Sequence, residues 1–119
     1  MKTAQLRMLI LELLLRIEKD RSFSHLLINR EIQKSNLTTK DEALLTEIVY
    51  GTLERKLTLD YYLSSYVDPT KKLDLWVKVL LRMSVYQMIF LDKIPDHAII
   101  HEAVEIAKQK GHRGTQGFI

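Results

Sequence analysis

The chain has 119 residues, of which 46% are hydrophobic, and these two values predict one folded domain rather than a disordered segment. It contains no cysteine, which excludes disulfides, thiolate metal sites and a cysteine nucleophile from this sequence. Lysine and arginine number 18 against 15 acidic residues, so the net charge of +3 leans only mildly toward polyanionic partners.

Residues 4–17 place apolar side chains on one broad arc of a helical wheel and predict an amphipathic helix. Arg7 projects from the apolar side of that helix. Either its stem lies on apolar surface while its head reaches water, or its guanidinium contacts a phosphate. Glu12 and Arg16 also interrupt the apolar run, unlike a signal peptide. Together with the lack of cysteine, this predicts a cytoplasmic protein.

Two local signals mark the start of a third helix. A second helix is expected to end before Asn36, a residue type that suits the left-handed backbone found at helix ends. A capping box then follows, formed by Thr38 with Asp41 or by Thr39 with Glu42. These signals predict a tight turn between two helices.

The rest of the chain predicts three more helices. Gly51 lies inside the third helix, which indicates that a neighbouring helix passes close to the backbone there. A short helix is expected within 57–67. Residues 75–91 are apolar on nearly every side yet carry too many polar residues for a membrane span, so they predict the central helix of a water-soluble bundle. Beyond Pro95, residues 96–108 form an amphipathic pattern with a period of 3.6.

No catalytic motif is evident. The four glycines form neither a G-x-G-x-x-G nor a P-loop pattern. His97 and His101 lie four residues apart with Glu102 and Glu105 nearby, which suggests a metal site. However, H-E-x-x-E is not the zinc motif H-E-x-x-H, so ordinary surface histidines are the favoured interpretation.

Aromatic residues recur at helical spacing in the second half of the chain. Such spacing is typical of a hydrophobic core, and stacking on nucleic-acid bases is the alternative. The residues concerned are Tyr61, Tyr62, Tyr66, Trp76, Tyr86 and Phe90.

Basic residues give the better functional signal, because several cluster without an intervening acid. Such cations neutralise phosphates and release counterions, which gives salt-sensitive binding with little sequence reading. A solvated surface is the alternative for each cluster. The predicted RNA-binding residues are Lys2, Arg7, Arg55, Lys56, Lys72, Lys108, Lys110, His112 and Arg113.

Three segments resemble a known family. IPDHAIIHEAVEIAK resembles the signature of NusB-like RNA-binding domains, with His101 at the position where that signature has asparagine. LLTEIVYGTLERKLTLDYYL and WVKVLLRMSVYQMIFLDKIPDHA resemble the N-terminal domain of bacterial 16S rRNA cytosine-C5 methyltransferases of the RsmB (Sun/Fmu) type. The resemblance covers essentially the whole chain. It implies an all-α NusB-like bundle of two packed subdomains, with RNA contacts near the start of the first helix, where Lys2 and Arg7 match in position.

The resemblance also implies a function. Residues 1–119 would be a non-catalytic domain that docks 16S rRNA, cut before a C-terminal methyltransferase domain that packs against it in cis. S-adenosylmethionine and the catalytic cysteines would belong to that second domain, so this chain would hold no cofactor and no metal. No membrane partner is expected, and a weak homodimer is a further expectation.

Two alternatives stay open. One is a free-standing NusB antitermination factor that binds single-stranded RNA together with a ribosomal protein. The other is a structural module whose helical faces bind protein.

Overall fold

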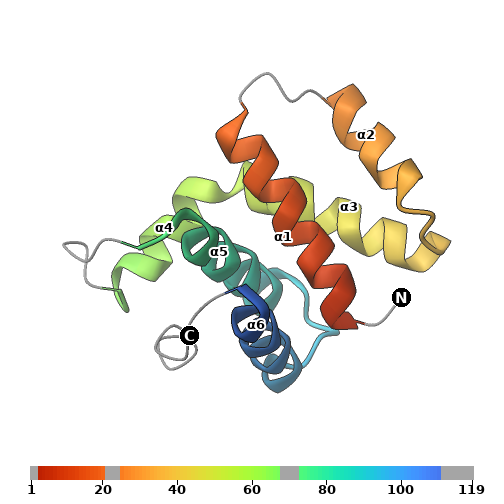
Figure 1. Ribbon diagram of the computed structural model, residues 1–119. Coiled ribbons are helices and arrows are strands. Elements are labelled where there is room, and N and C mark those ends of the chain that lie inside the picture. Colours follow the sequence, from red (N-terminus) through yellow and green to blue (C-terminus); the bar gives the residue numbers. More distant parts are fainter. Residues whose placement is uncertain (1–2, 21–24, 68–72, 111–119) are drawn as a thin grey trace.

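The computed structural model describes residues 3–20, 25–67 and 73–110, and within these ranges the regular structure is entirely helical (Figure 1). This confirms the predicted all-α class. The helices are α1 (Thr3–Lys19), α2 (His25–Lys34), α3 (Thr39–Glu54), α4 (Lys56–Ser64), α5 (Leu75–Phe90) and α6 (Asp96–Lys110). Helices α1, α2 and α3 lie toward one side of the molecule and α4, α5 and α6 toward the other (Figure 1).

Helix α5 is the centre of the bundle, as its apolar sequence predicts. It packs against α1, α3, α4 and α6, and α1 in turn packs against α3 and α6. The core is built from the aliphatic arc of α1 and the buried side of α5, for example Ile10, Leu14, Leu80 and Met83. A helix contacted from four directions cannot have a wide polar face, which explains the nearly continuous apolar sequence of α5.

The local signals between α2 and α3 are confirmed. Asn36 has a positive φ of 52°, the left-handed conformation that ends a helix. The Thr38 side chain accepts a hydrogen bond of 3.2 Å from the Asp41 backbone N–H, so Thr38 caps α3. Pro95 directly precedes the first turn of α6. The Pro95 carbonyl accepts from the Ile99 N–H, and Asp96 lies in the first turn of the helix rather than before it.

The predicted aromatic core is only partly correct. Tyr86 is buried, whereas Tyr61, Tyr62 and Tyr66 are exposed. Helix α4 is short and packs mainly on α5, so only one of its sides is covered, with Leu59 fully buried there. The three tyrosines therefore lie at the surface because α4 has no neighbour on its outer side among the described residues.

In the part of the chain that the structure describes, no helix is both long and apolar enough to cross a membrane.

Gly51 lies where α3 meets the ring of Tyr86 from α5. A Cβ atom added at Gly51 would overlap the Tyr86 phenol ring. This confirms the predicted close approach of a neighbouring helix and explains a glycine in the middle of a helix.

We predict that Gly51→Ala destabilises the fold, although alanine is favoured over glycine in a helix by about 1 kcal/mol. Overpacking against the buried Tyr86 ring costs about 1–3 kcal/mol, so after the gain in helix propensity the free energy of unfolding should fall by up to about 2 kcal/mol in urea denaturation. Glu47→Ala, at an exposed position of α3, is the control and should change stability little. A stabilised Gly51→Ala variant would contradict the close contact.

Candidate nucleic-acid interface

Arg7 lies in the interior of the bundle, not at its surface. Its side chain is only 6% exposed, its Nε donates to Gln87 Oε1 at 2.9 Å, and the same Nε lies 3.3 Å from Glu102 Oε2. The prediction that its head reaches water is therefore wrong, and a phosphate has no access to this guanidinium in the folded chain. The side chain instead joins α1 to α5 and α6.

The environment of Arg7 explains how a charge is held inside the core. Burial lowers the pKa of Arg7, while the negative charges of Glu102 and Asp41 act in the opposite direction. Arginine keeps its proton under such conditions because its ordinary pKa is so high. Gln87 completes the cluster by donating from its Nε2 to the Met83 carbonyl at 3.0 Å. Buried charge is tolerated here because each group has a partner.

Arg55 and Lys56 lie side by side in sequence but have different roles. Arg55 is exposed, and its guanidinium carbon lies 4.3 Å from the centre of the Phe90 ring, a cation–π contact that leaves the charge at the surface. Lys56 is half-buried, and its Nζ lies 2.8 Å from Glu18 Oε1. Of this pair, Arg55 is the better candidate for a phosphate contact.

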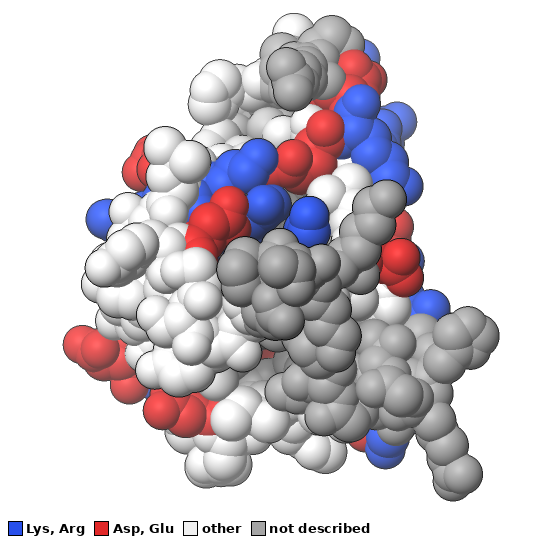
Figure 2. Space-filling view, turned by 90° about the vertical axis from the view of Figure 1, so that its left-hand side faces the viewer, with Lys and Arg blue, Asp and Glu red and all other residues white. Residues whose placement is uncertain are grey.

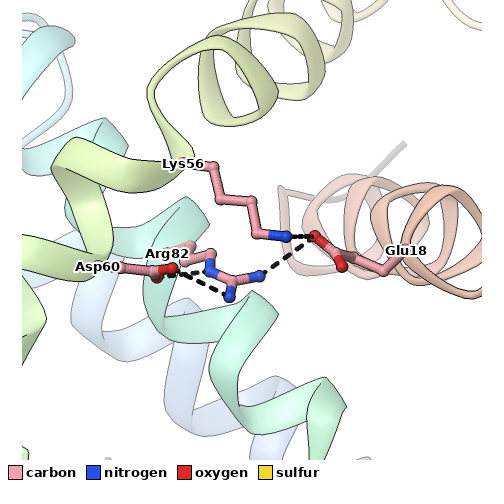
Figure 3. A network of polar contacts seen from close by, with 4 residues as sticks. All are labelled: Glu18, Lys56, Asp60 and Arg82. Carbon is pink, nitrogen blue, oxygen red and sulfur yellow. Dashed lines mark hydrogen bonds and ion pairs between the residues drawn. The ribbon is translucent and has the colours of Figure 1, made fainter.

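Lys56 belongs to a network of four charged residues that joins α1, α4 and α5 (Figure 3). Arg82 donates to both carboxylate oxygens of Asp60, from Nε at 2.7 Å and from NH2 at 3.2 Å. Its NH1 also donates to Glu18 at 3.3 Å. Two positive and two negative charges cancel, so this network fixes helices and contributes no net charge to the surface.

Lys108 and Lys110 lie in the last turn of α6, where the sequence predicts a basic cluster. Lys108 is exposed and pairs within the helix with Glu105 at 3.2 Å. Lys110 Nζ reaches Glu12 on α1 at 2.8 Å. Surface ion pairs of this kind contribute little free energy, so both ammonium groups stay available to a competing phosphate.

Four of the predicted contacts, Lys2, Lys72, His112 and Arg113, lie outside the described residues. Among the predicted residues that the structure describes, Lys108 and Lys110 lie together in the last turn of α6, and Arg55 lies at the start of α4.

The predicted set of RNA-binding residues leaves out several exposed cations that stand apart from the clusters in the sequence. Within residues 3–20, 25–67 and 73–110, these side chains have no ion-pair partner. They are Lys19, Arg30, Lys40, Lys78 and Lys93. Figure 2 shows the face on the α4 side, where basic and acidic side chains lie next to one another instead of forming one positive field.

The two histidines suggested as metal ligands, His97 and His101, are both exposed on α6. Within the described ranges, no three potential ligands among His, Cys, Asp and Glu lie close enough together to hold a metal ion.

We predict that Glu102→Met destabilises the fold by about 3–5 kcal/mol, because it leaves the Arg7 charge buried without its partner. In the double variant Arg7→Met/Glu102→Met no charge remains buried, so most of this loss should be recovered. Urea denaturation of wild type, both single variants and the double variant measures the coupling. Losses that simply add would show that the two side chains do not interact.

"Probable ribosomal RNA small subunit methyltransferase B" of Bacillus subtilis is 46% identical over 119 residues, a match that covers 100% of this chain and 27% of that protein. "Transcription antitermination protein NusB" of Bacillus licheniformis is 35% identical over 94 residues, or 76% of this chain and 72% of that protein. This chain spans about a quarter of the length of the methyltransferase relatives that it matches.

A solved structure of NusB from T. maritima superimposes with a TM-score of 0.86 at 24% identity, covering 99% of this chain and 86% of that one. It shows the same fold. The NusB family profile matches residues 4–119. This chain belongs to the NusB family.

Proposed function

We propose that this chain is the non-catalytic, rRNA-docking domain of an S-adenosylmethionine-dependent methyltransferase that modifies a cytosine of 16S rRNA at C5. The observation that carries the proposal is the match to the Bacillus subtilis relative. It runs along the whole of this chain at 46% identity but takes in only 27% of a protein named for methylation of small-subunit rRNA. The part that matches this chain is thus one portion of such an enzyme. In this proposal, methyl transfer belongs to the rest of the protein.

The residues of this chain support a binding role rather than a catalytic one. Methylation of cytosine C5 by the covalent mechanism needs a cysteine thiolate that adds to C6 of the ring, and the sequence contains no cysteine. The buried charged residues Arg7 and Glu102 are paired with each other rather than directed into an open site. In this proposal S-adenosylmethionine and the nucleophile belong to a catalytic domain in cis, in a cytoplasmic enzyme.

The end of α6 is the surface that we assign to RNA. Lys108 and Lys110 lie in one helical turn, and the sequence continues directly into His112 and Arg113. A phosphate can replace Glu105 or Glu12 as the partner of these lysines, since surface pairs are weak. Contacts of this kind fix position on an RNA backbone and read little sequence, which suits a docking domain.

A second candidate function is that of a free-standing antitermination protein. The observation that favours it is the Bacillus licheniformis NusB relative, of which the match covers 72%. The lower identity of 35%, and the shorter match of 94 residues against 119, make it the weaker candidate.

We predict that Lys108→Gln/Lys110→Gln weakens binding to structured fragments of 16S rRNA. Log affinity falls as log salt concentration rises, and removing two phosphate contacts should reduce the magnitude of this negative slope by about 1–2. Titrations by fluorescence anisotropy at several salt concentrations measure this slope, and circular dichroism checks that the helices are retained.

The matched control is Lys40→Gln/Lys93→Gln, which removes the same amount of charge from exposed sites at the start of α3 and before α6. Its salt slope should stay close to that of wild type. Equal losses in both double variants would show that RNA responds only to net charge, and that the end of α6 is not the binding surface.

A further inference from the structure

Helix α4 is held from one side only. Its two charged residues, Lys56 and Asp60, lie one helical turn apart and pair with Glu18 and Arg82 on α1 and α5 (Figure 3). Leu59, between them in sequence, is fully buried. The charges of α4 are thus all directed at the body of the domain, and the helix is fixed in orientation.

The opposite side of α4 is uncharged and largely apolar. Exposure reaches 84% for Leu57, 74% for Tyr61 and 44% for Tyr62 on α4, and 88% for Tyr66 in the turn that follows the helix. We call these four residues the α4 face. In Figure 2, which views the molecule from the side where α4 lies, a broad area without charged side chains is visible. Large apolar groups gathered in this way mark interaction surfaces.

The composition of the α4 face favours a protein partner over RNA. Protein interfaces are enriched in tyrosine and depleted of charge at their centres. Leucine has neither a hydrogen-bonding group nor an aromatic ring with which to recognise a base. Stacking surfaces for single-stranded RNA combine aromatic rings with free cations. Within α4, the basic residue Lys56 is paired with Glu18, and Arg55, which directly precedes the helix, lies over the Phe90 ring of α5 rather than over the tyrosines.

The rigidity and the size of the α4 face also suit a protein–protein interface. Tyr61 and Tyr62 contact each other edge to face, with ring centres 6.1 Å apart, on a helix whose inner side is fixed by ion pairs. Tyrosines held in this way lose little conformational freedom on binding. A tyrosine side chain can bury roughly 150–250 Å² in full, so the exposed parts of these residues supply a large share of the ~800 Å² per partner of a standard interface.

We propose that the α4 face docks the catalytic domain of the same polypeptide; this inference rests on the proposed function. Most of the length of the Bacillus subtilis relative lies outside the matched part, so the domain has a large neighbour to accommodate. The Bacillus licheniformis NusB relative is covered over 72% of its length and has no comparable remainder. Docking through a rigid, uncharged face leaves the lysines at the end of α6 free for RNA and fixes their position relative to the catalytic centre.

Hydroxyl-radical footprinting with mass spectrometry tests this directly, because it reports the exposure of individual side chains. The 119-residue chain and the full-length gene product are labelled side by side. We expect labelling of Leu57, Tyr61 and Tyr66 to fall several-fold in the full-length protein, while labelling of Leu26 and Ile100, which are exposed on α2 and α6, stays unchanged. Equal labelling of the α4 face in both proteins would overturn the proposal.

Variants of the full-length protein provide the second test. Leu57→Ser/Tyr61→Ser/Tyr66→Ser should increase the radius of gyration in small-angle scattering, because the two domains separate. The control Leu26→Ser/Ile100→Ser should leave it unchanged. In the 119-residue chain, both sets should keep wild-type affinity for 16S rRNA fragments. If the α4 variant alone lost RNA affinity there, the α4 face would be an RNA surface and the docking proposal would fail.

Failure of the proposed function has a different signature. The proposed function would be contradicted if the wild-type chain had no affinity for 16S rRNA fragments, or if the full-length product did not methylate rRNA. Footprinting still tests domain docking in that case, because it measures side-chain exposure and not RNA binding.

Discussion

The burial of α5 is the constraint on which the other features depend. Four helices pack against it, so each polar side chain that it buries has to find a partner within the protein. Gln87 does so with Arg7, which brings in Glu102 from α6. Arg82 does so with Asp60 and Glu18, which fixes α4 and the end of α1. Two polar clusters on one apolar helix thus set the positions of three neighbours.

Because several cations are paired inside the fold, fewer remain at the surface to contact RNA phosphates. Arg7 and Lys56 both serve the architecture, so the surface available to phosphates is smaller than the composition implies. The remaining cations are spread over several helices, with acidic residues between them. Such a surface favours a domain that positions a long, structured RNA through a few backbone contacts over one that reads a short sequence. That fits the proposed role of an auxiliary domain attached to a catalytic one.

Signals that act within a few residues could be predicted from the sequence. The apolar period of 3.6 residues predicted the helices. Asn36 and the Thr38 cap predicted the turn before α3, and Gly51 predicted a close contact between helices. Partners from distant parts of the chain could not be predicted. An arginine on the apolar side of α1 is compatible with either a surface or an interior position, and only the approach of α5 and α6 decides between them.

The central claim is that this domain serves catalysis by holding rRNA. Methylation of 16S rRNA by the full-length product and by a form lacking residues 1–119 tests it most directly, with S-adenosylmethionine binding as the check that the shortened protein is folded. The account predicts a large rise in KM for rRNA with a much smaller change in kcat, because binding that is lost in the ground state and transition state alike leaves the chemical step intact. An unchanged KM would contradict it.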